Sequence, residues 1–114
     1  MSEPTNDPID LAVLEELQSS VGREFVDELI GTYLEETPAL MAALGPARAA
    51  GEAAEFKRLA HSIKSSSSTF GAAELAGLAR ALELGGVPAD GAPLAALDEA
   101  YGRAAARLAE LRRG

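Results

Sequence analysis

One short stretch of the chain gathers the side chains best suited to chemistry. It reads FKRLAHSIKSSSSTFGAA and runs from Phe56 to Ala73. The stretch holds the chain's one histidine, His61, together with three cations and no acid, although the whole chain has a formal net charge of −8. A neutral imidazole can act near pH 7 as a base, a metal ligand or a nucleophile. The stretch is therefore the candidate functional site.

Two of these roles find little support in the residues around His61. A metal site lacks ligands, because the chain has no cysteine and no second histidine, and no acid is expected within one helical turn on the same face. A hydrolytic triad needs an activated nucleophile and an oxyanion hole. A serine one turn away on the same helix is poorly aimed for that role. An ordinary surface histidine and a phosphoryl-accepting histidine both remain open.

The phosphoryl-accepting role suits the neighbours of His61. A phosphorylated imidazole is anionic, and nearby ammonium groups stabilise both the product and the group in transfer. Lys57 precedes His61 by four residues and Lys64 follows it by three, so both lie one helical turn away. Arg58 is a weaker candidate at the rim. Ser65 and Ser68 are small, so a partner's active site can close over the imidazole. They belong to a serine run, Ser65–Ser68, and the alternative explanation of this run is a frayed helix end.

The composition sets the surroundings of this site. The 114 residues predict one domain with a modest core, rich in Ala and Leu and without cysteine. No apolar run approaches the ~20 residues of a membrane span, and the acidic N-terminus is unlike a signal peptide. The net negative charge disfavours a nucleic-acid partner. We therefore expect a cytoplasmic monomer that binds neither nucleic acid nor membrane.

Hydrophobic periodicity predicts an all-α protein. Residues 1–6 are expected to be flexible, and residues 7–114 to form the domain. The pattern predicts a short helix that starts at an N-cap Asp7 and ends at Gly22, then helices from about Arg23 to Leu44 with an extension toward Ala50, from about Glu52 to Gly71, from Ala72 to Leu84, and from about Leu94 to Arg112. Pro38 predicts a kink inside the second predicted helix, which begins at about Arg23. Short links between the four longer helices predict an antiparallel up-down four-helix bundle with a short additional N-terminal helix.

A helical projection places His61 on the outer face of the third predicted helix. With about 100° per residue, the apolar side chains of this segment fall on one stripe, opposite the imidazole. The predicted buried stripe consists of Phe56, Leu59, Ala60, Ile63, Ser67 and Phe70. No glycine-rich loop follows a strand to hold ATP. The phosphoryl group must therefore come from another protein.

The same stretch resembles the signature of histidine-containing phosphotransfer (HPt) domains. Their pattern is roughly A-H-x-L-K-G-S-[SA]-x-x-x-G-A-x-x-L-x-x-x-x-x-x-L-E. The matching residues here are Ala60, His61, Ile63, Lys64, Ser66, Ser67, Gly71, Ala72, Leu75, Leu82 and Glu83. The resemblance extends over about residues 10–111. Ser65 stands where the family usually has glycine, which bears on partner affinity or choice.

The resemblance implies a four-helix bundle with a phospho-accepting His61 and reversible exchange with aspartates of receiver domains. The donors and acceptors would be hybrid histidine kinases and response regulators, and the Mg²⁺ belongs to the receiver side, so no metal or cofactor is expected here. The expected protein is not an enzyme in its own right. A stand-alone protein fits the length, and an excised domain would look the same. A helical adaptor that binds such partners by shape, with His61 incidental, is the alternative, and a free-standing enzyme has no support in the sequence.

Overall fold

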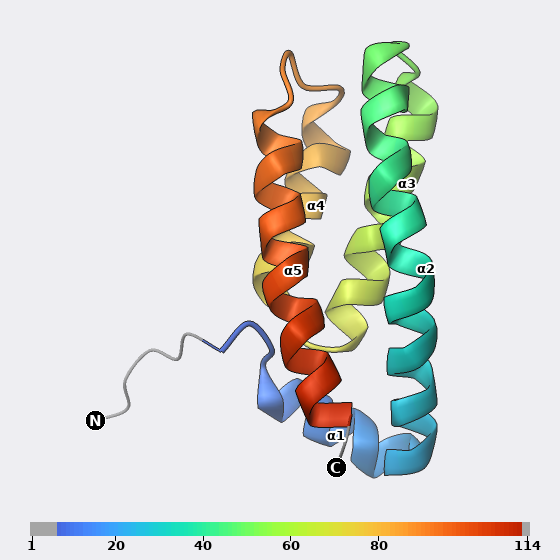
Figure 1. Cartoon of the computed structure of the whole chain (residues 1–114), viewed down its shortest axis with the longest axis vertical. Coiled ribbons are helices and arrows are strands. Elements are labelled where there is room, and N and C mark those ends of the chain that lie inside the picture. Colours follow the sequence, from blue (N-terminus) through green and yellow to red (C-terminus); the bar gives the residue numbers. More distant parts are fainter. Residues whose placement is uncertain (1–6, 113–114) are drawn as a thin grey trace, which may run out of the picture.

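The computed structural model describes residues 7–112, which form five α-helices and no strand (Figure 1). The helices are α1 (Leu11–Val21), α2 (Arg23–Ala49), α3 (Ala53–Thr69), α4 (Ala73–Gly85) and α5 (Ala92–Arg112). The all-α prediction is confirmed, and the predicted helix ends lie within a few residues of the observed ones. The predicted flexible residues 1–6 lie outside the described part of the chain, as do residues 113–114.

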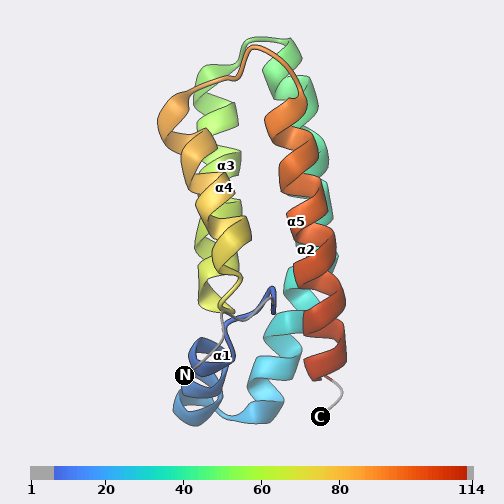
Figure 2. The same cartoon turned by 90° about the vertical axis from the view of Figure 1, so that its left-hand side faces the viewer.

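The long helices pack in a closed order around a single core. α3 contacts α2 and α4, and α5 contacts α4 and α2, so each of the four touches two neighbours. Figures 1 and 2 show the chain reversing direction from each long helix to the next, with α1 across one end of the bundle. The largest fully buried apolar side chains come from α2 to α5 and from the segment before α1; they are Ile9, Val26, Ile30, Leu44, Phe56, Leu59, Ile63, Leu75, Leu97 and Leu108. None of the helices in residues 7–112 combines the length and the apolar character needed to cross a bilayer.

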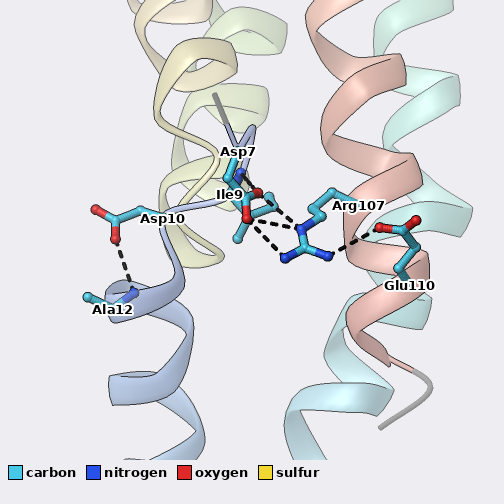
Figure 3. A network of polar contacts seen from close by, with 6 residues as sticks. All are labelled: Asp7, Ile9, Asp10, Ala12, Arg107 and Glu110. Atoms are coloured by element: carbon cyan, nitrogen blue, oxygen red, sulfur yellow. Dashed lines mark hydrogen bonds and ion pairs between the residues drawn. The ribbon is translucent and has the colours of Figure 1, made fainter. Parts of the chain in front are cut away.

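The start of α1 differs from the prediction. Asp10, and not Asp7, is the N-cap, because its side chain accepts the backbone N–H of Ala12 at 3.1 Å. Asp7 instead accepts the N–H of Ile9 at 2.9 Å and forms an ion pair with Arg107 of α5 at 3.0 Å (Figure 3). The sequence offered two acids near the helix start, and only the long-range contact with α5 decides between them.

α2 runs unbroken through both of its prolines, Pro38 and Pro46. The predicted extension of this helix is confirmed, since it ends at Ala49 with Ala50 as the C-cap. Apolar side chains stay on one face on both sides of Pro38, and their burial supports the helix where the proline removes a backbone donor. This length brings α2 alongside the whole of α3.

A three-residue turn, Phe70 to Ala72, joins α3 to α4 and fixes their relative position. Gly71 has φ 79°, a conformation that glycine adopts without steric cost. A Cβ atom at Gly71 would lie 2.7 Å from the carbonyl oxygen of Asp10. In the same place the Asp10 N–H donates to the Gly71 carbonyl at 2.8 Å. The glycine therefore permits both the tight turn and the close approach of the segment before α1.

A buried hydrogen bond links α2 to α3 through Ser67, the buried member of the serine run. The hydroxyl groups of Tyr33 and Ser67 lie 2.7 Å apart, and both residues are almost fully buried. Burial raises the pKa of the Tyr33 phenol to about 12. The Tyr33 ring also packs at a tilt against Phe70 and Tyr101, so this polar pair lies inside an aromatic cluster.

Candidate functional site

α3 presents His61 to solvent, as its sequence predicts. All six residues of the predicted stripe on this helix are buried, from Phe56 to Phe70. The His61 side chain is 55% exposed on the opposite side. The helix is fixed by burial of the stripe against α2 and α4, so the imidazole projects from a rigid support.

A carboxylate from α4 reaches the imidazole, which corrects the prediction of a face without acids. Glu83 Oε2 lies 2.7 Å from His61 Nδ1. The two residues are far apart in sequence, and the antiparallel packing of α3 and α4 brings them together. A helical projection of α3 alone could not include an acid from another helix.

The same carboxylate pairs with Lys64. Lys64 Nζ lies 2.9 Å from Glu83 Oε1, so the two oxygens of one carboxylate hold the lysine and the histidine side by side. Contact with Lys64 and, next, with His61 holds the pKa of the Glu83 carboxyl below its ordinary value. The Glu83 side chain is only 12% exposed, whereas Lys64 is 27% exposed. The ammonium group therefore offsets a carboxylate that is largely withdrawn from water.

This arrangement selects one tautomer of His61. An ionised carboxylate can only accept hydrogen bonds, so the short contact with Glu83 requires the proton on Nδ1. In the neutral ring the lone pair then belongs to Nε2. Nε2 makes no hydrogen bond with any of residues 7–112. The structure thus holds an exposed imidazole whose free nitrogen is the nucleophilic one.

The remaining predicted cations differ in their surroundings. Arg58 is held by Glu55 through hydrogen bonds of 2.7 and 2.9 Å on the same helix, and this contact lowers the pKa of the Glu55 carboxyl. Lys57 is exposed and forms no ion pair within residues 7–112. The structure therefore separates the three cations. Lys64 belongs to a cluster with His61 and Glu83 (the His61 cluster), and Arg58 forms a local pair with Glu55. Lys57 has no acid partner among the described residues.

The serine run stays helical as far as Thr69, so its helix does not fray before the turn. Two hydroxyl groups donate hydrogen bonds to backbone carbonyls one helical turn earlier. Ser66 donates to the Ser62 carbonyl at 2.9 Å, and Thr69 donates to the Ser65 carbonyl at 3.1 Å. Ser65 and Ser68 are exposed, on the His61 side of the helix. Their short side chains keep the surface low beside the imidazole.

His61 lies on open surface. A hollow between α2 and α3, lined by residues such as Tyr33 and Thr69, does not include it, and neither does one beside the start of α4, lined by residues such as Glu74 and Arg103. Among the described residues, no group of three or more His, Asp or Glu side chains is arranged to hold a metal ion.

Glu83 is the site residue to which the sequence assigned no role, beyond being the last matching position of the family pattern. Its distance from His61 in sequence hides the contact, because periodicity reports the faces of one helix and not the pairing of two. The signal that could have identified it is an acid placed one residue after the buried Leu82, near the end of a helix that must pack against α3.

Comparison with known proteins agrees with this geometry. A protein-family model described as "Hpt domain" matches residues 28–107, well over half of the chain. The matched span contains His61, Lys64 and Glu83 and reaches from α2 into α5. Neither a curated protein nor a solved structure matches the chain.

Proposed function

Because the chain belongs to the Hpt domain family, which serves histidine phosphotransfer in two-component phosphorelays, we propose that it is a phosphorelay intermediate that carries the phosphoryl group on His61. The donor is the phosphorylated aspartate of a receiver domain in a hybrid histidine kinase. The acceptor is the receiver aspartate of a response regulator. The observation that carries the assignment to His61 is its 2.7 Å contact with Glu83, which leaves Nε2 as the free ring nitrogen.

The proposed transfer consists of two displacements at phosphorus, and no other reactant is consumed. The Nε2 lone pair attacks the phosphorus of the aspartyl phosphate, an N–P bond forms, and the P–O bond to the aspartate breaks. The aspartate leaves as a carboxylate. The ring keeps its Nδ1 proton and gains positive charge, which the Glu83 carboxylate stabilises through the hydrogen bond. In the second transfer the aspartate of the response regulator attacks the phosphorus, and Nε2 is the leaving group.

The cations have separate roles in this proposal. Lys64 neutralises charge on the phosphoryl group from within the His61 cluster, and its pairing with Glu83 supports its position. Lys57 forms no ion pair within residues 7–112 and adds a second positive charge one turn away. Arg58, Ser65 and Ser68 form the rim on which the receiver docks. Ser65 replaces the glycine that the family usually has, so we place partner choice there.

We also propose the arrangement of the helices, the oligomeric state and the cellular location. Each of the helices α2 to α5 contacts two of the others in a closed ring, which supports the antiparallel up-down four-helix arrangement. α1 is an added helix across one end. The domain spans residues 7–114 and acts as a monomer in the cytoplasm. In this proposal the phosphoryl group comes from a partner and not from ATP, so kinase activity resides in the partners. The open surface around His61 supports a site that is completed by docking.

A transfer assay tests the proposal directly. The purified protein is incubated with a receiver domain carrying ³²P on its aspartate, alone and with a second receiver present. Wild type is expected to acquire acid-labile, base-stable label and to pass it on. His61→Gln is expected to acquire none while keeping its circular dichroism spectrum and melting temperature, because the side chain is exposed.

Two results would contradict the proposal in different ways. Label on the His61→Gln protein shows that another residue accepts the phosphoryl group. Unchanged receiver binding and signalling by the His61→Gln protein in cells shows an adaptor that works by shape, in which the histidine is incidental.

A further inference from the structure

The outer face of α4 next to Glu83 has two features that the His61 cluster does not use. Arg80 is exposed and forms no ion pair within residues 7–112. Leu84 is the most exposed large apolar side chain among those residues, at 66%. The two residues are four positions apart, so they are neighbours on one face of the helix.

The free state of Arg80 follows from the His61 cluster. Glu83 is three residues further along α4 and is the acid that a helical pair with Arg80 would use. Its two oxygens are taken by His61 and Lys64 from α3. The other acid on α4, Glu74, pairs with Arg103 of α5 at 2.9 Å. The packing therefore leaves the guanidinium of Arg80 with no acid on its own helix.

The position of Arg80 relates it to Ser65. Arg80 precedes Glu83 by three residues, so it lies about 60° around the axis of α4 from Glu83 and about 4.5 Å along that axis. α3 and α4 are antiparallel, so a step back along α4 corresponds to a step forward along α3, from His61 toward Ser65 (Figure 2). Arg80 thus lies across from Ser65, on the same side of the helix pair as the imidazole. Gly77 and Ala81, also exposed, keep this face of α4 low.

We propose that Arg80 and Leu84 form the α4 half of the surface on which a receiver domain docks. This inference rests on the proposed function, because it takes the receiver as the occupant. A phosphorylated receiver presents negative charge around its aspartate, and Arg80 is complementary to it in a chain whose own net charge is −8. Leu84 supplies an apolar contact beside that charge, continuous with the His61 cluster through Glu83. Interfaces combine such an apolar anchor with a polar rim.

The test measures transfer kinetics and receiver binding for matched variants. Arg80→Glu is expected to raise KM for the phosphorylated receiver about tenfold, with the rate at saturation nearly unchanged and a weaker salt dependence. Leu84→Ser is expected to raise KM by roughly threefold to tenfold. Arg80→Lys should restore most of the affinity. The controls are Arg23→Glu and Phe25→Ser at the opposite end of the bundle. There α2 begins with an exposed arginine that forms no ion pair within the described residues and a half-exposed phenylalanine.

The outcomes separate this inference from the proposed function. If wild type transfers phosphoryl groups and neither α4 variant changes KM beyond its control, the docking surface is wrong and the function stands. If a receiver binds wild type without transfer and the α4 variants weaken binding, the function is wrong and the surface stands. If no receiver of a full panel binds, both are wrong.

Discussion

Lys64 of α3 and Glu83 of α4 form an ion pair of 2.9 Å, and the second oxygen of the same carboxylate holds His61. One acid therefore connects the proposed nucleophile to its nearest cation. Substituting any member of this cluster therefore changes the environment of the other two.

Removal of the Glu83 carboxylate should impair transfer through the imidazole. In Glu83→Ala the Nδ1 proton loses its acceptor, so both tautomers of His61 become populated and the charge on the phosphorylated ring is less stabilised. We expect transfer to slow by about tenfold or more. The ¹⁵N shifts of the His61 ring should move from one defined tautomer to a mixture. Unchanged shifts and rate would show that Glu83 does not orient the ring.

Lys64→Ala should slow transfer with little loss of stability. Glu83 keeps its contact with His61 in this variant, and the lost ammonium group is partly exposed, so the folded state loses little, whereas the phosphoryl group loses a neutralising charge. The melting temperature is expected to fall by no more than about 3 °C. Lys57→Ala, which removes an exposed lysine that pairs with no acid among the described residues, is the comparison, and the ratio of the two rates assigns the larger contribution. A large fall in melting temperature for Lys64→Ala would instead point to a structural role.

Gly71→Ala should destabilise the fold. The added Cβ would lie 2.7 Å from the Asp10 carbonyl oxygen at a positive φ, so either the turn or the segment before α1 must move. We expect a loss of about 2 kcal/mol in the free energy of unfolding, measured with urea. Gly102→Ala is the matched control, because that glycine is exposed within α5 with no atom near its Cβ. It should stabilise the protein by about 0.5–1 kcal/mol.

The hydrogen bond between Tyr33 and Ser67 should contribute to stability as a pair. Tyr33→Phe leaves the buried Ser67 hydroxyl without its partner, and Ser67→Ala does the same to the phenol. Each change is expected to cost about 1–2 kcal/mol of unfolding free energy. The double variant should cost clearly less than the sum of the two. Simple additivity in this cycle would mean that the two hydroxyls do not interact.

The ion pair between Asp7 and Arg107 should make stability depend on pH in the acid range. Hydrogen bonds from Arg107 hold the pKa of the Asp7 carboxyl below its ordinary value in the folded protein. The stabilisation is therefore complete above the unfolded-state pKa of about 3.9 and is lost as the pH falls through the lower folded-state pKa. The melting temperature of Asp7→Asn should lie below that of wild type near neutral pH, and the two should converge at the acid end.

Asp98→Asn is the control for this pH series. It removes an exposed carboxylate from the outer face of α5. Its melting temperature should follow that of wild type at every pH. A gap between wild type and Asp7→Asn that stays constant down to the lowest pH would contradict the assigned charge interaction.

The sequence predicted most of the fold and the exposure of His61. Apolar spacing along each segment gave five helices with nearly correct ends, and the stripe from Phe56 to Phe70 placed His61 on the outer face of its helix. These features depend on local periodicity, which one segment carries by itself. The predicted N-cap at Asp7 was wrong because two acids compete near that helix start, and the contact with Arg107 decides the outcome.

The electrostatic character of the site was decided by the tertiary structure. Residues 56–73 contain cations and no acid, so the sequence by itself determined an exposed histidine in a positive stretch. Packing of α4 against α3 added the Glu83 carboxylate, which fixes the tautomer of His61, pairs with Lys64 and leaves Arg80 without an acid partner on its own helix. A hydrogen bond between residues on two helices depends on their register and crossing, and no single segment encodes either of them.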